Sequence, residues 1–160
     1  MASSRIDPLS AFNFYITLID SSSIAGNLIT AALGYAVAGF SECSGLEATV
    51  EIMDYREGGL NTYVHRFATR ASYSNLTLKR GVILYDDLWT WHYAWVQGTG
   101  TRKDGLLVLL NESRSPAKIW KFKSGIPTKW VGPAFNAGQS SVAIESLEIA
   151  HEGLVLELGA

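Results

Sequence analysis

The stretch ECSGLEATVEIMDYREGGLNTYVHRF, residues 42–67, decides the fold of this chain. Polar and apolar residues alternate along its first half, reach a charged turn, and alternate again beyond it. Successive side chains of a β-strand point to opposite faces, so this pattern predicts a long β-hairpin. Gly58 and Gly59 are expected to supply the positive φ angles of the reversal at its tip. A domain that needed only to bury a core would not need so long an arm with so polar a tip.

The alternation also assigns side chains of this predicted hairpin to faces. On the outgoing strand, one face is expected to carry Leu46, Ala48, Val50 and Ile52, and the other Glu47, Thr49, Glu51 and Met53. The return strand is expected to place Tyr63, His65 and Phe67 opposite Thr62, Val64 and Arg66.

Other segments have the alternation or the composition of β-strands. Residues 12–20 alternate Phe12, Phe14, Ile16 and Leu18 with polar neighbours, which predicts a strand with one buried face. Residues 105–111 form an unbroken apolar run of strand length, which predicts cover on both faces. The remaining strand candidates are 36–43, 75–84 (broken by Gly81) and 118–123, whereas 125–139, rich in Gly, Pro, Asn and Ala, is expected to be an ordered loop.

Residues 86–98 change the period of the pattern. One helical stripe, spaced i, i+3, i+4 and i+7, is formed by Leu88, Trp91, His92 and Trp95. Asp86 or Asp87 is expected to cap the first turn, and Gly98 stands where a left-handed glycine ends a helix. This segment is therefore predicted to be an α-helix.

Two segments stay open on periodicity alone. Residues 21–35, rich in Ser, Ala and Gly and free of charge, are compatible with a small helix or an irregular excursion. In residues 140–158, Ile144, Leu147 and Leu154 suit a helix, whereas the β-branched content and the ending LVLEL suit a strand.

The composition is apolar for a small protein. Of the 160 residues, 48% are hydrophobic and 18% are charged, and five are tryptophan. An aromatic-rich core would explain these values, and so would a surface buried against neighbouring subunits. Composition alone favours neither explanation.

Charge and cysteine content restrict the partners and the compartment. The formal net charge of -2 gives no reason to expect nucleic acid or an anionic membrane as a partner. Cys43 is the only cysteine, so no intrachain disulfide can form. We see neither a signal peptide at the start nor an apolar run long enough to span a membrane. We therefore expect a soluble, cytoplasmic product that does not insert into membranes.

The sequence offers little catalytic chemistry. His65, His92 and His151 have no second His or Cys at metal-ligand spacing, so no metal site and no cofactor are expected. Cys43 could be drawn as a nucleophile with a histidine base, but a half-buried strand residue is the more frequent role of a lone cysteine. No phosphate-binding, dinucleotide-binding or nucleophile-elbow motif is present. We therefore do not expect an enzyme.

Carboxylates and tryptophans have structural explanations as well as functional ones. Asp86 and Asp87 are explained by capping and the helix dipole, and the series Glu145, Glu148 and Glu152 by a solvated or subunit-facing strand face. The alternative function is a monomeric β-barrel binding module with Trp89, Trp91 and Trp95 as its ligand platform. Aromatic stripes at helical spacing belong more often to a core than to a ligand site.

Several strings resemble the tail-tube (inner tube) family of contractile phage tails and extracellular contractile injection systems. They occur in family order along nearly the whole chain: DPLSAFNFYITL (7–18), VAGFSECSGLEATVEIMDYREGG (37–59), YSNLTLKRGV (73–82), LWTW (88–91), KW with GP (129–133) and SVAIESLEIAHEGL (141–154). Each string alone is weak, but the combination is specific.

This resemblance implies a mainly β fold, an antiparallel sandwich or small barrel with one flanking helix, related to the type VI secretion tube protein. It implies that residues 1–160 are one tail-tube domain whose last segment is a strand. Six copies would close into a ring, and stacked rings would form the tube with a continuous lumen. Residues 21–35 depart from the family pattern and are expected to be an insertion between the first two strands.

The resemblance also implies a non-catalytic structural role, as a conduit for cargo. The expected partners are other copies of the chain, the sheath, baseplate and spike proteins of the same particle, and cargo in the lumen. The candidate subunit-contact residues are Tyr55, Arg56, Glu57, Gly58, Gly59, Asn61, Lys79, Arg80, His151 and Glu152. The candidate lumen-facing residues are Thr49, Glu51, Thr62 and Glu145.

Overall fold

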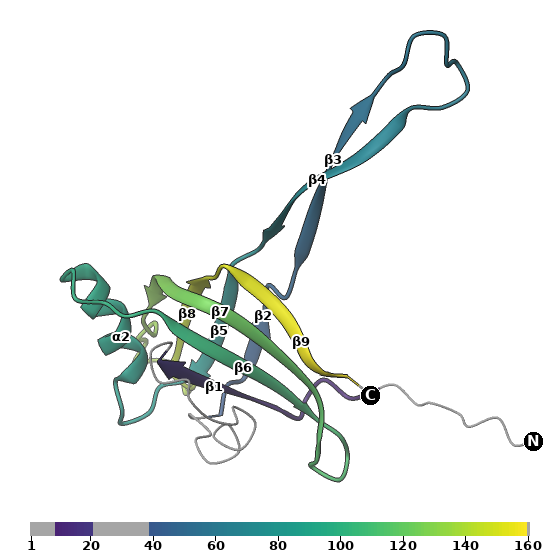
Figure 1. Ribbon diagram of the computed structural model, residues 1–160. Coiled ribbons are helices and arrows are strands. Elements are labelled where there is room, and N and C mark those ends of the chain that lie inside the picture. The colour runs from purple at the N-terminus through teal and green to yellow at the C-terminus, as the bar shows by residue number, and fades with distance from the viewer. Residues whose placement is uncertain (1–8, 21–38, 160) are drawn as a thin grey trace, which may run out of the picture.

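The computed structural model describes residues 9–20 and 39–159 as a body of packed β-strands from which a two-stranded arm projects (Figure 1). The body is a seven-stranded antiparallel sheet in the order β1-β6-β7-β8-β5-β2, with β9 also paired to β7. The predicted fold class, mainly antiparallel β with a flanking helix, is confirmed. The proposed insertion at 21–35 lies outside the described residues.

Strand β7 (Pro116–Val131) divides the sheet into two halves that face each other. The first half-sheet consists of β1 (Phe14–Asp20), β6 (Lys103–Leu110), the beginning of β7 and β9 (Gly153–Gly159). The second half-sheet consists of the end of β7, β8 (Ile144–Ala150), β5 (Leu76–Gly81) and β2 (Glu42–Ser44).

The core lies between the two half-sheets. Ile16, Leu107 and Phe122 from the first pack in one cluster with Leu78 and Leu147 from the second. Each of these five side chains is buried. Burial of apolar surface is the dominant favourable contribution to the free energy of folding.

Two strands of the first half-sheet are buried on both faces. In β6 this confirms the cover predicted from the apolar run, because Leu106 and Leu107 point to opposite faces and both are buried. For β1 the prediction of one buried face is wrong, since Thr17 is as buried as Ile16, at 1% exposure each. Phe12 precedes the strand and is 76% exposed.

The predicted helix is α2 (Asp87–Val96), which packs on β7. Leu88 and Trp91 are buried and carry the stripe expected from the sequence. Gly98, at φ 78°, donates its N–H to the carbonyl of Trp95, so the predicted left-handed glycine is confirmed. Asp86 is the N-cap residue but makes no side-chain capping hydrogen bond, so the predicted cap is wrong in that detail.

The segment after residue 118 differs from its prediction. β7 continues through Gly125 to Val131, so the expected loop at 125–139 begins only after Val131. Gly and Pro in this region do not end the strand, because β8 pairs with residues 126–131 and supplies their hydrogen-bond partners. The ambiguous last segment consists of the strands β8 and β9, as the family resemblance implied.

The arm consists of β3 (Ala48–Tyr55) and β4 (His65–Tyr73). The predicted hairpin is confirmed as an antiparallel pair, but its bounds are shifted, since residues 42–44 form β2 in the body and the return strand reaches residue 73. A register shift between Val50 and Ile52 interrupts the expected strict alternation.

Glycines at the base and at the tip shape the arm. At the tip only Gly59 has a positive φ, 91°, so the prediction that Gly58 shares this role is wrong. Gly45, at the base, has φ 89°, and a Cβ there would lie 2.1 Å from the carbonyl oxygen of Asn75. Glycine is therefore required where the chain leaves the body for the arm.

Candidate functional site

The arm lacks the cover that the strands of the body receive. Every residue of β3 is exposed, and β3 and β4 pack extensively only on each other. A two-stranded hairpin with no third element against it is marginally stable in water. The arm therefore gains little stability from contacts within the described part of the chain.

Apolar side chains concentrate on one face of this arm. The cross-strand pairs Met53 with Phe67 and Tyr55 with His65 share this face. The Tyr55 and Phe67 rings lie 6.3 Å apart, and Tyr63 packs edge-on against His65 at 5.3 Å. We call Met53, Tyr55, Tyr63, His65 and Phe67 the aromatic face. Met53, Tyr55, Tyr63 and Phe67 remain at least half exposed, between 50% and 60%.

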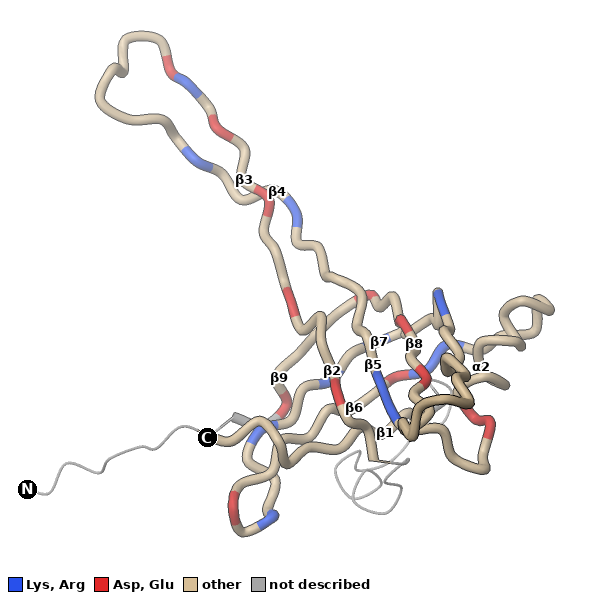
Figure 2. Tube along the Cα trace, turned by 180° about the vertical axis from the view of Figure 1, so that it is seen from behind, with Lys and Arg blue, Asp and Glu red and all other residues tan. Residues whose placement is uncertain are grey.

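Charged groups of both signs lie along the arm, with acidic residues on β3 facing basic residues on β4 (Figure 2). Arg66 pairs with Asp54 at 3.4 Å and Arg70 with Glu51 at 2.8 Å, while His65 contacts Glu57 at 3.3 Å. Arg56 is exposed, and no described residue forms an ion pair with it. Arg56 thus differs from Arg66 and Arg70, which are paired across the arm.

Six of the candidate contact residues belong to the arm tip: Tyr55, Arg56, Glu57, Gly58, Gly59 and Asn61 are all exposed. On the body, Lys79 donates to both carboxylate oxygens of Glu42 at 2.9 and 3.0 Å, and Glu152 pairs with Arg102. His151 is half-buried, with Nδ1 3.1 Å from the Gly153 carbonyl. The structure therefore separates these candidates into an arm group and a body group.

Two of the residues predicted to lie at a subunit contact or in the lumen, Arg80 and Glu145, are inside the subunit instead. Arg80 is 1% exposed and Glu145 is 7% exposed, so neither side chain is available for the subunit contact or the lumen that the sequence suggested. Arg80 Nε donates to Glu145 Oε1 at 2.7 Å, and Trp130 Nε1 donates to Glu145 Oε2 at 2.9 Å. The other lumen candidates, Thr49, Glu51 and Thr62, are exposed on the arm.

Arg80 also fixes the start of α2. Its Nη2 donates to Asp87 Oδ1 at 2.5 Å and to the Tyr85 carbonyl at 3.4 Å. Burial alone would lower the pKa of Arg80, but the hydrogen bonds that Arg80 donates to Asp87 and Glu145 outweigh it and raise that pKa. The guanidinium is therefore charged and satisfied, and it joins β5, β8 and α2 from the inside.

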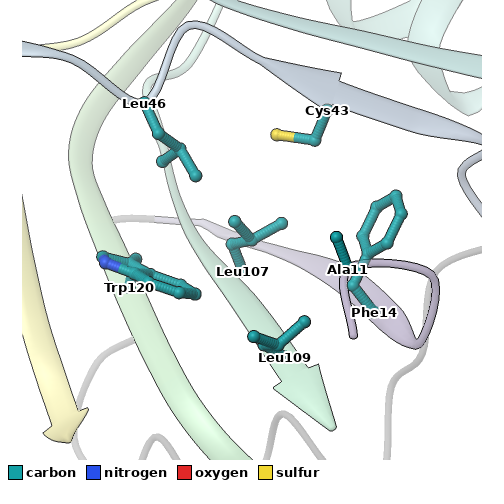
Figure 3. A pocket seen from close by; sticks show the side chains of 7 residues that line it. All are labelled: Ala11, Phe14, Cys43, Leu46, Leu107, Leu109 and Trp120. Carbon is teal, nitrogen blue, oxygen red and sulfur yellow. The ribbon is translucent and has the colours of Figure 1, made fainter. Parts of the chain in front are cut away.

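An apolar pocket of about 200 Å³ opens between β1 and β2, and Cys43 lies in its wall (Figure 3). Its lining is Ala11, Phe14, Cys43, Leu46, Leu107, Leu109 and Trp120. Burial, and then the negative charge of Glu42, raise the pKa of the Cys43 thiol to about 11. The thiol is therefore protonated near neutral pH, the opposite of an activated nucleophile.

The three tryptophans of the alternative ligand platform do not form one exposed surface. Trp91 is 5% exposed, and its Nε1 donates to the Thr101 carbonyl at 2.9 Å, as does the Trp95 Nε1 at 3.2 Å. Trp89 is 40% exposed and packs edge-on against Trp130 at 4.7 Å. His92 Nδ1 lies 3.3 Å from the Pro127 carbonyl, a packed position like the one expected from the sequence.

Across residues 9–20 and 39–159, no three His, Cys, Asp or Glu side chains are grouped as metal ligands would be. In that described part, no helix has the length and apolarity that crossing a membrane requires.

The comparison with protein families gives one decisive match. The model of the family described as T4-like virus tail tube protein gp19 matches residues 10–155. The chain belongs to this tail tube family. Its role is accordingly that of a structural tube protein. The comparison with curated protein sequences finds no significant match.

Solved structures show how far the tail tube fold extends. A chain of the anti-feeding prophage baseplate, solved with six-fold symmetrisation, superposes with a TM-score of 0.80 at 24% identity, over 97% of this chain and 98% of that chain. A chain of the sheath-tube complex of the extracellular contractile injection system PVC gives 0.77 at 19% identity, over 94% and 91%. A type six secretion system protein gives 0.53 at 18% identity, over 91% and 83%.

The arm could be predicted from the sequence, but the internal contact of Arg80 with Glu145 and Asp87 was not predicted. In β5, Leu76, Leu78 and Arg80 share one face because they are two residues apart. The same spacing places Glu145 with Leu147 on the inner face of β8. The spacing of two residues from a buried leucine, in β5 and in β8, could therefore have predicted that Arg80 and Glu145 point inward.

Proposed function

We propose that six copies of this tail tube protein close into a ring and that rings stack into the inner tube of a contractile particle. The observation that carries this proposal is an arm in which every residue of β3 and all but the two end residues of β4 are exposed, on a chain of the tail tube family. Such an element gains stability only when a partner covers it. In a tube of identical subunits, that partner is another copy.

Strand edges of the body support assembly as well. Among the described strands, β1 pairs only with β6, β2 only with β5, and β9 only with β7. Each of these strands therefore has an edge with backbone donors and acceptors not used by a described neighbour. Open edges favour pairing with another chain, and a closed ring satisfies them in an ordered way.

Surface composition agrees with a large buried interface. Large apolar side chains such as Phe12, Leu84, Phe135 and Val142 are between 76% and 97% exposed in the isolated chain. Isolated exposed apolar residues are common, but so many on a chain of 160 residues fit obligate subunit contacts.

The proposed contact residues are the arm group, with Tyr55, Arg56, Glu57, Gly58, Gly59 and Asn61, and the body group, with Lys79, His151 and Glu152. Thr49, Glu51 and Thr62 are the proposed lumen-facing residues, since they are exposed and polar. Arg80 and Glu145 are withdrawn from both sets because they are buried inside the subunit.

The remaining parts of the proposal concern the particle. The chain acts as one domain over residues 1–160 with an insertion at 21–35, and it assembles in the cytoplasm. The tube contacts sheath, baseplate and spike proteins and conducts cargo, without catalysis. The likeness to chains from an injection-system baseplate and a sheath-tube complex supports these partners. The raised pKa of Cys43 supports the absence of a thiol nucleophile.

Electron microscopy of the purified full chain over a range of salt and protein concentrations tests the proposal. We expect six-fold rings or stacked tubes. A variant without residues 49–72, in which two glycines join Ala48 to Tyr73, is the control that should stay monomeric with an intact body. A wild-type protein that remains monomeric under all conditions would contradict the proposal.

A further inference from the structure

A second uncovered apolar surface lies on the body, at the end of β5 away from the arm. We call it the distal patch, made of Val82, Ile83, Leu84, Tyr85, Val142 and Ile144. All six side chains are exposed, Leu84 at 97% and Tyr85 at 77%. Four consecutive exposed apolar residues, 82–85, are unusual for a surface loop and indicate a contact surface.

The loop that carries the distal patch is held in place by the body. Val82 donates its N–H to the Ala143 carbonyl at 2.9 Å, which joins the two segments of the patch. At the other end of the loop, the buried Arg80 donates to the Tyr85 carbonyl at 3.4 Å. The exposed side chains therefore stand on a fixed backbone, and binding there costs little ordering entropy.

The distal patch and the arm lie at opposite ends of the second half-sheet. Strand β5 begins at Leu76, next to the base of the arm, and runs to Gly81, where the patch begins. Figure 1 shows the arm extending away from the body beyond the start of β5, whereas the loop from β5 to α2 lies on the other side. One subunit therefore cannot cover its own patch with its own arm.

The charges beside the two apolar surfaces are complementary. Arg56 at the arm tip has no ion-pair partner among the described residues. Asp86 follows directly on the distal patch, is exposed, and makes no side-chain capping bond to α2. Within the described ranges, Arg56 is thus a cation without an ion-pair partner directly after Tyr55 of the aromatic face, and Asp86 is an anion without one directly after Tyr85 of the patch.

We propose that the aromatic face of the arm of one copy docks on the distal patch of the next copy, with Arg56 against Asp86. This inference rests on the proposed function and names the two surfaces that meet. Because the surfaces differ, the contact is heterologous, and each subunit offers one free arm and one free patch. Such a contact joins copies in one direction and gives the assembly a polarity.

Site-directed cross-linking tests the contact. In a Cys43→Ser background, protein with Arg56→Cys is mixed with protein with Asp86→Cys, assembled, and treated with a short bismaleimide. We expect a covalent dimer whose linked peptides join position 56 to position 86. The matched control pairs Arg56→Cys with Glu112→Cys, which is exposed in the turn between β6 and β7. A 56–86 yield no higher than the 56–112 yield overturns the inference.

Charge reversal provides a second measurement without added cysteines. Arg56→Glu and Asp86→Arg should each raise the critical concentration for assembly about two- to five-fold, as loss of one exposed ion pair predicts. The double variant should return it toward the wild-type value. If the increase in critical concentration in the double variant is the sum of the increases in the two single variants, the pairing is contradicted.

The two proposals fail in different ways. Rings or tubes that form without the 56–86 link keep the tube function and overturn the arm-to-patch contact. A 56–86 link between copies that form no ring or tube keeps the contact and overturns the proposed assembly of six-membered rings into a tube. If neither the 56–86 link nor any assembly forms, both proposals are overturned.

Discussion

The body and the arm are built from the same kind of antiparallel strand, yet they hold their residues in opposite environments. In the body, Leu147 is fully buried and Arg80 is bound by Glu145 and Asp87. In the arm, Ile52 is 56% exposed, and Arg66 reaches Asp54 across a solvated surface. The difference teaches that the body is stabilised by its own contacts, whereas the arm leaves its side chains exposed, as the proposed subunit contact requires.

Removal of the internal guanidinium should have the largest effect on the free energy of unfolding. Arg80→Ala leaves the buried Glu145 carboxylate without its cation, a change that typically costs about 3 to 5 kcal/mol. Arg66→Ala breaks an exposed pair on the arm and should cost about 1 kcal/mol or less. Urea unfolding of the two variants under monomeric conditions measures both values, and equal losses would contradict the distinction between body and arm.

Truncation of matched apolar side chains comes next. Leu147→Ala opens a cavity between the half-sheets and should lower the free energy of unfolding by about 2 to 5 kcal/mol. Ile52→Ala on the arm should change it by about 0.5 kcal/mol or less. The same arm variant should weaken assembly, measured by sedimentation, while Leu147→Ala should lower the melting temperature first. An arm variant that unfolds as easily as the core variant would show that the arm is part of the core.

The two left-handed glycines of the arm should respond unequally to a methyl group. Gly59→Ala adds only the cost of a positive φ, about 1 to 2 kcal/mol, because no atom lies within 4 Å of the new Cβ. Gly45→Ala adds the same cost and also a collision with the Asn75 carbonyl, so the loss should be larger. Thermal unfolding of the two variants measures the difference. A smaller loss for Gly45→Ala would mean that the base of the arm can move.

The smallest effect concerns pH and the thiol at the edge of the core. The folded-state pKa of Cys43, about 11, lies above its ordinary value of 9.0, so the fold favours the protonated thiol. This contribution to stability is complete below pH 9.0 and is lost as the pH rises toward about 11. Thiol labelling of the folded protein should therefore accelerate only as the pH nears that higher value, whereas the urea-unfolded protein should label from about pH 8.5. Identical pH profiles would contradict the burial of Cys43.

Much of the secondary structure could be predicted because local patterns decide it. The period of Leu88, Trp91 and Trp95 predicts α2, and the unbroken run at 105–111 predicts a strand covered on both faces. The continuation of β7 to Val131 could not be predicted, since Gly125 and Pro127 argue locally for a loop. Pairing with β8, a long-range contact, overrides that local preference.

The candidate site divides in the same way. The sequence by itself determined the arm, its polar tip and the abundance of apolar residues that need cover, because alternation and composition are local properties. Only the tertiary structure decided that Arg80 and Glu145 face inward, because their burial depends on the register between β5 and β8. Only the tertiary structure placed residues 82–85 beside Val142 at the end opposite the arm. Strand pairing brings together residues distant in sequence, and periodicity within one strand does not contain that information.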